Sequence, residues 1–86
     1  MTSTALFPAQ APATRSASLM QNLSTELRVP GHRLYNFTRL REDLFLDTMD
    51  VELLLASLES KLGYYLTEEE ASQIETVGDI KTFFLR

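Results

Sequence analysis

Residues 47–63 decide the fold, and they read Asp47-Thr48-Met49-Asp50-Val51-Glu52-Leu53-Leu54-Leu55-Ala56-Ser57-Leu58-Glu59-Ser60-Lys61-Leu62-Gly63. The apolar residues recur at helical spacing and share one continuous face, which comprises Val51, Leu54, Leu55, Leu58 and Leu62. Asp47 or Thr48 can cap the start of this helix, because a side-chain oxygen there accepts a hydrogen bond from a free amide of the first turn. Gly63 stands where helices commonly end. We therefore predict a buried helix between these two ends.

Upstream of this segment, a leucine pattern predicts another helix, from about Thr14 or Ser16 to Leu27. Its buried stripe consists of Leu19 or Met20, Leu23 and Leu27. The sequence Val-Pro-Gly at 29–31 ends it, since proline and glycine together stop helices. Residues 1–13 show no helical period and are predicted to be a flexible tail, which leaves 14–86 as the domain.

A long connection over 28–47 joins the two helices, and it contains Leu34, Phe37, Leu40, Leu44 and Leu46. A structureless loop of this length is unusual in a small domain. We therefore expect the connection to pack across the helices through its apolar side chains.

Downstream, Thr67-Glu68-Glu69-Glu70 has the form of a capping box and predicts a short helix that ends near Gln73. The segment 76–79, Thr-Val-Gly-Asp, opens a final helix in the same way. The buried side of that helix is predicted to comprise Val77, Ile80, Phe83 and Phe84. With no strand alternation, the fold class is all-α, a small four-helix bundle with a long loop between helices 1 and 2.

Charge and composition narrow the function classes. The chain has 86 residues, no cysteine and a formal net charge of −4. Residues 1–40 carry four Arg and one Glu, whereas residues 41–86 carry four basic and eleven acidic side chains. The acidic part favours basic protein surfaces and argues against nucleic-acid binding. No apolar run is long enough to cross a bilayer and no secretion signal is present, so we expect a cytoplasmic protein.

Several motifs together resemble the acyl carrier protein family. Residues 40–50, Leu-Arg-Glu-Asp-Leu-Phe-Leu-Asp-Thr-Met-Asp, are similar to the family's apolar-x-Glu-Asp-Leu-Gly segment and the Asp-Ser-Leu-Asp that follows it. Residues 66–71 resemble its Ile-Pro-Asp-Glu-Glu-Ala, and residues 74–80 resemble its Ile-x-Thr-Val-Gly-Asp-Leu. The likeness spans about 16–86 with the family's spacing throughout.

The resemblance implies a function and a site. In this family a transferase that uses coenzyme A attaches 4'-phosphopantetheine to the serine hydroxyl, and acyl groups are carried on the terminal thiol. By position, Thr48 is the candidate attachment residue. Partner enzymes in fatty-acid-like or polyketide-like biosynthesis use their own basic residues to dock on the acidic second helix of the carrier. The residues implied for docking are Asp47, Met49, Asp50, Glu52 and Glu59. We expect the protein to be a monomer.

The chain departs from the family pattern at three places. Threonine replaces the serine, and its extra methyl crowds the in-line approach that the transfer requires. Phe45-Leu46 stand where the family has a glycine before Asp-Ser, and they put bulk near the site. Leu53 and Ala56 replace residues that are commonly acidic or larger on the side that faces partners.

Two functions follow, an acyl carrier modified at Thr48 and an unmodified interaction module that docks synthase enzymes without an acyl chain. An enzyme is not indicated. Glu68, Glu69 and Glu70 are consecutive on a helix and spread over different faces, so they cannot converge on one metal ion. No catalytic or metal-binding residue is therefore predicted.

Overall fold

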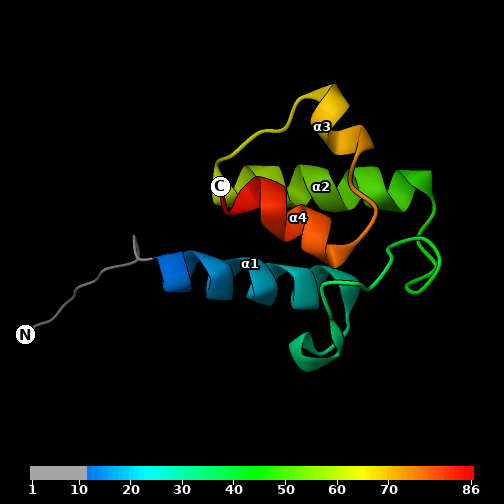
Figure 1. Ribbon diagram of the computed structural model, residues 1–86, viewed down its shortest axis with the longest axis horizontal. Coiled ribbons are helices and arrows are strands. Elements are labelled where there is room, and N and C mark those ends of the chain that lie inside the picture. The colour runs from blue at the N-terminus through cyan, green and yellow to red at the C-terminus, as the bar shows by residue number, and fades with distance from the viewer. Residues whose placement is uncertain (1–11) are drawn as a thin grey trace, which may run out of the picture.

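The computed structural model describes residues 12–86 and shows an all-helical domain. Figure 1 shows the elements α1 (Pro12–Leu27), the short 3₁₀ helix η2 (Gly31–Arg33), α2 (Thr48–Leu62), α3 (Glu68–Ser72) and α4 (Val77–Phe84). Within this part of the chain the backbone forms no strand, only an isolated antiparallel bridge between Arg39 and Thr76. The predicted fold class is confirmed.

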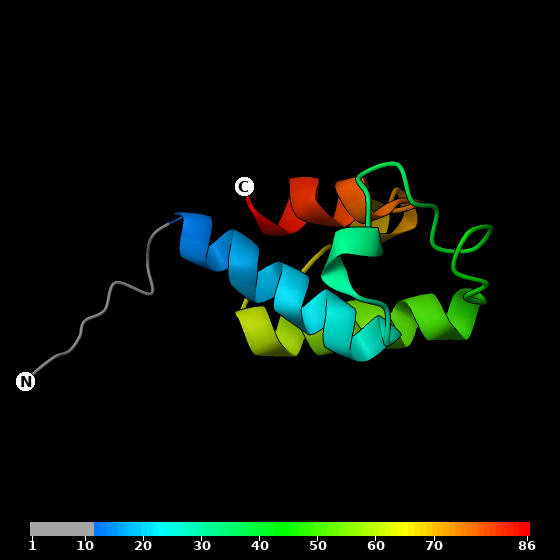
Figure 2. The same cartoon turned by 90° about the horizontal axis from the view of Figure 1, so that it is seen from below.

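The core lies where α1 packs against α2 and α4. Figure 2 shows α1 crossing α2 obliquely, and α4 also packs against α1. Leu19, Leu23, Leu58, Val77 and Ile80 have no accessible surface. The predicted α2 face is confirmed, because Val51, Leu54, Leu55 and Leu58 are buried and Leu62 is half-buried.

Helix α1 begins earlier than predicted. It starts at Pro12, whereas the sequence placed its start at Thr14 or Ser16. The predicted tail over 1–13 therefore contributes Pro12 and Ala13 to α1. Residues 1–11 of that tail lie outside the described residues.

The long connection over 28–47 packs as expected, with Leu34 and Leu40 buried. Its backbone is joined to the chain that leads into α4, because the Leu40 N–H donates to the Glu75 carbonyl at 2.9 Å and the Val77 N–H donates to the Thr38 carbonyl at 2.9 Å. Phe37 is the exception, with 74% of its surface exposed and its ring stacked on Tyr35 at a centroid distance of 5.1 Å.

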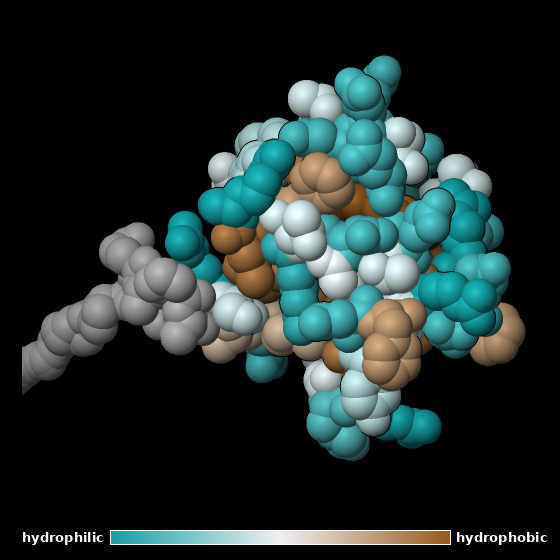
Figure 3. Space-filling view, viewed as in Figure 1, coloured by the Kyte–Doolittle hydropathy of each residue, from teal (hydrophilic) through white to brown (hydrophobic). Residues whose placement is uncertain are grey.

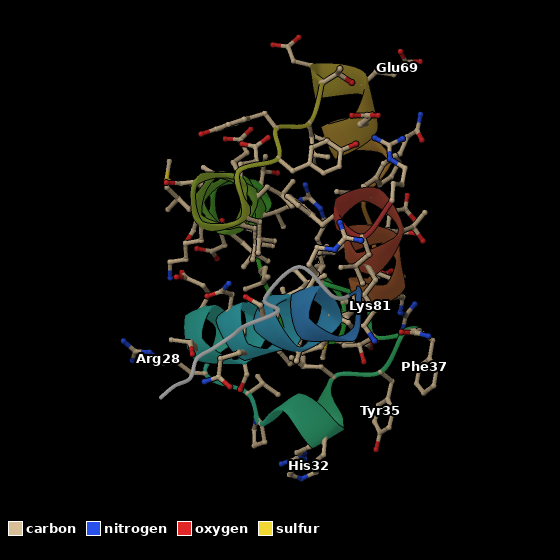
Figure 4. The ribbon with its side chains drawn as sticks, turned by 90° about the vertical axis from the view of Figure 1, so that its left-hand side faces the viewer. Arg28, His32, Tyr35, Phe37, Glu69 and Lys81 are labelled. Atoms are coloured by element: carbon tan, nitrogen blue, oxygen red, sulfur yellow. The ribbon has the colours of Figure 1, made fainter. Side chains whose placement is uncertain are left out.

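The loop after α1 and the helix α3 lie at opposite ends of the view in Figure 4. Figure 4 shows Arg28, His32, Tyr35 and Phe37 at the end that lies away from Glu69 of α3. On the face drawn in Figure 3, hydrophobic surface shows between mostly hydrophilic side chains. Among the described residues, no helix has both the length and the apolar character that crossing a membrane requires.

Candidate functional site

The start of α2 is fixed by a reciprocal pair of aspartates. Asp47 is the N-cap, and its carboxylate accepts the Asp50 N–H at 2.8 Å. In return, the Asp50 carboxylate accepts the Asp47 N–H at 3.1 Å. Of the two candidates for the cap, Asp47 fills the role and Thr48 does not.

Thr48 is the first residue of α2, and it is exposed. Its hydroxyl oxygen accepts a hydrogen bond from Nη1 of Arg41 at 2.9 Å. Since Asp47 supplies the cap, this hydroxyl has no part in holding the helix end. The capping interaction therefore does not depend on this hydroxyl.

A tight turn before α2 presents Arg41 to Thr48. The Leu46 N–H donates to the Leu40 carbonyl at 3.1 Å, and Leu40 itself is buried. The Asp43 carboxylate accepts the Arg39 backbone N–H at 2.8 Å and also pairs with its guanidinium, at 3.3 Å. These two interactions, the backbone one first, hold the pKa of Asp43 below its ordinary value. Arg41 thus lies on a turn that is stabilised by the hydrogen bonds of Arg39, Asp43 and Leu46.

A groove of about 750 Å³ runs beside Thr48, between α2, α3 and the turn. The apolar part of its lining consists of Leu40, Val51, Leu55, Ala71 and Ile74. The polar part consists of Arg41, Glu42, Thr48, Glu52, Glu68, Ser72 and Glu75. Thr48 therefore borders a space that has an apolar wall and a charged rim.

The residues predicted for docking lie in two kinds of surroundings. Met49 and Glu52 are exposed, with 67% of the Met49 surface accessible, whereas Asp47 and Asp50 are exposed but occupied in the capping box. Glu59 is half-buried, and its carboxylate accepts the Leu66 N–H at 2.8 Å. Glu59 therefore anchors the segment that leads into α3.

Phe45 adopts a backbone conformation that the sequence did not reveal. Its φ angle is +59°, in the left-handed region that glycine enters without steric cost. This conformation gives a physical reason for the glycine that the family pattern places before Asp-Ser. The side chain is 86% exposed and does not line the groove, so its bulk lies outside this space.

The contact between Arg41 and Thr48 was also missed from the sequence. The two residues are seven positions apart, and one of them lies in a loop. No helical or strand period relates side chains across such a turn. Arg41 falls at the unspecified position of the family's apolar-x-Glu-Asp-Leu-Gly segment, so no sequence signal singled it out.

The all-helical bundle and an exposed hydroxyl at the start of α2 define a small carrier-type domain. The chain is 37% identical over 75 residues to the acyl carrier protein MbtL of Mycolicibacterium paratuberculosis, which covers 86% of this chain and 84% of that protein. It is 33% identical over 66 residues to MbtL of Mycobacterium sp. strain MCS, covering 77% of this chain and 74% of that one. It is also 33% identical over 60 residues to an acyl carrier protein of Saccharopolyspora erythraea, covering 70% of this chain and 63% of that protein.

No protein-family model matches the chain. The extent and identity of the first two relatives nevertheless show the family. The chain belongs to the acyl carrier protein family. The resemblance found in the sequence is confirmed.

Proposed function

We infer that this chain carries acyl groups on 4'-phosphopantetheine joined to Thr48 and presents them to enzymes of fatty-acid-like or polyketide-like biosynthesis. The observation that carries this proposal is the exposed Thr48 hydroxyl at the first position of α2, on the rim of the groove. The relatives' names support an acyl carrier role. Attachment at threonine is our proposal.

The residues around Thr48 fit an attached 4'-phosphopantetheine group, called the arm below. Asp47 caps the helix, so esterification of the neighbouring hydroxyl leaves the cap intact. In the attachment step, the Thr48 oxygen bonds to the β-phosphorus of coenzyme A as the pyrophosphate bond breaks, 3',5'-adenosine diphosphate leaves, and the hydroxyl proton passes to a base of the transferase. When bound, the arm supplies a thiol that holds acyl groups as thioesters. Val51, Leu55 and Ile74 give the groove an apolar wall against which an acyl chain can lie.

Partner enzymes are proposed to dock on the exposed side of α2. Glu52 offers a free carboxylate and Met49 an apolar contact, next to the attachment residue. Asp47, Asp50 and Glu59 add negative charge while they serve the fold. Basic surfaces of acyl-processing enzymes and of the transferase complement this face. We propose that the protein acts in the cytoplasm as a monomer and without catalysis of its own.

One observation favours the second candidate function, an unmodified interaction module. Thr48 bears a methyl group, and its oxygen is already occupied by Arg41. A protein with the same docking surface and an unmodified hydroxyl could regulate or organise a synthase. The two functions differ in a single measurable property, the covalent state of Thr48.

Intact mass separates them. The purified protein is incubated with coenzyme A and a promiscuous phosphopantetheinyl transferase, beside the Thr48→Ser and Thr48→Ala variants. We expect the native chain and Thr48→Ser to gain one phosphopantetheine, and Thr48→Ala to gain none. A gain in Thr48→Ser alone would favour the interaction module.

A further inference from the structure

We propose that Arg41 binds the phosphodiester of the arm on Thr48 and fixes the root of the arm at the mouth of the groove. This inference rests on the proposed function. It assigns a role to a side chain that the sequence motifs did not single out. Arg41 acts here as a positioning residue for the prosthetic group.

The contact with the Thr48 oxygen carries the proposal. Nη1 of Arg41 lies 2.9 Å from Oγ1, the atom to which the phosphorus is joined. The non-bridging phosphate oxygens are bonded to that same phosphorus, so they come within the reach of the guanidinium. Arginine presents its donors as a planar fork that matches two phosphate oxygens. The contact to the hydroxyl can thus be exchanged for a charge-assisted contact to the phosphate.

The groove is lined by several carboxylates, so a bound phosphodiester needs a nearby positive charge. Among the described residues, Arg41 is the one basic residue in the groove lining, which also holds Glu42, Glu52, Glu68 and Glu75. A phosphodiester is anionic and is repelled by this rim of carboxylates. Arg41 supplies the compensating charge at the point where the arm is attached.

The braced turn leaves Arg41 available. Its neighbours Glu42 and Asp43 both pair with Arg39, at 3.6 and 3.3 Å. No carboxylate of the described residues forms an ion pair with Arg41. Because Leu40 is buried and its N–H is bound to Glu75, the turn holds the guanidinium beside α2. The side chain is therefore positioned before the arm is attached.

Phosphorus NMR tests the proposal on the holo-protein. The arm is attached to the Thr48→Ser chain, and the ³¹P chemical shift is measured in the folded state and after unfolding in urea. We expect folding to displace the resonance, and Arg41→Gln to remove most of that displacement. Arg33→Gln on η2 makes the same charge change away from the groove and should retain the displacement. An unchanged displacement in Arg41→Gln would overturn the proposal.

A further variant and a folding control distinguish failure of the Arg41 assignment from failure of the proposed function. Arg41→Lys retains the charge without the fork and should recover part of the displacement, which a merely structural role would not predict. Circular dichroism of each variant confirms that it is folded. If the native chain gains no arm while Thr48→Ser does, the proposed function fails at Thr48, and the assignment of Arg41 is still decided by the phosphorus spectrum.

Discussion

Asp47 and Asp50 exchange side-chain-to-backbone hydrogen bonds of 2.8 and 3.1 Å at the start of α2, and this pair, rather than Thr48, caps the helix. A hydroxyl that is not needed for the cap can carry a modification without a structural penalty at the helix end. The arrangement assigns two neighbouring residues to separate tasks. Asp47 holds the helix, and Thr48 is available for chemistry.

Because Asp47 caps α2 and Thr48 does not, the two alanine substitutions should lower the free energy of unfolding by different amounts. Asp47→Ala should lower the free energy of unfolding by about 1 kcal/mol, because it leaves the Asp50 N–H without its capping partner. Thr48→Ala should cost less, since it removes only an exposed contact to Arg41. Urea denaturation followed by circular dichroism measures both. Equal costs would mean that Thr48 shares the capping role.

The left-handed backbone at Phe45 predicts a gain from glycine. A non-glycine residue in this region costs about 1–2 kcal/mol, whereas glycine loses about 0.5–1 kcal/mol through backbone entropy. Phe45→Gly should therefore raise the free energy of unfolding by up to about 1.5 kcal/mol in the same denaturation experiment. Phe45→Ala removes the exposed ring but keeps the strained Cβ, so it should give no such gain. A loss of stability in Phe45→Gly would show that the ring matters to the fold.

The turn that carries Arg41 predicts a pH dependence. The Arg39 backbone N–H, and then its guanidinium, hold the folded-state pKa of Asp43 below its ordinary value of 3.8. The resulting stability is present above the unfolded-state pKa and is lost as the pH falls through the lower folded-state pKa. Asp43→Asn should thus be less stable than the native chain at neutral pH, and the difference should narrow below about pH 3.8. A difference that stays constant with pH would contradict the role of the charge.

The exposed carboxylate of Glu52 predicts a docking defect without a folding defect. Glu52→Lys should lower kcat/KM of the transferase for this protein, most strongly at low salt. The free energy of unfolding should change by less than about 0.5 kcal/mol. Glu69→Lys on α3 makes the same charge change at another exposed position. An equal loss in both variants would mean that the transferase senses net charge rather than this face of α2.

Local patterns in the sequence predicted most of the fold. The spacing of Val51, Leu54, Leu55 and Leu58 gives α2 its buried face, and Thr67 and Thr76 cap α3 and α4 as their capping boxes indicate. These features depend on residues a few positions apart. They are therefore visible before any tertiary structure is known.

The site was less predictable from the sequence, because its side chains meet across turns rather than along a helix. Arg41 and Thr48 are seven positions apart, and the turn between them is tied to a distant segment, because the Leu40 N–H donates to the carbonyl of Glu75, 35 positions further along the chain. Glu59, a predicted docking residue, is also seven positions from its partner, since its carboxylate accepts the Leu66 N–H across the end of α2. No periodicity encodes either contact.

The covalent state of Thr48 in the protein purified from the cell that makes it distinguishes an acyl carrier from an unmodified module. Trypsin should release residues 42–61, which contain Thr48, and fragmentation mass spectrometry locates any modification within them. We predict that this peptide carries 4'-phosphopantetheine on Thr48. A peptide found only in its unmodified form, from cells whose other acyl carriers are loaded, would contradict the account and favour the interaction module.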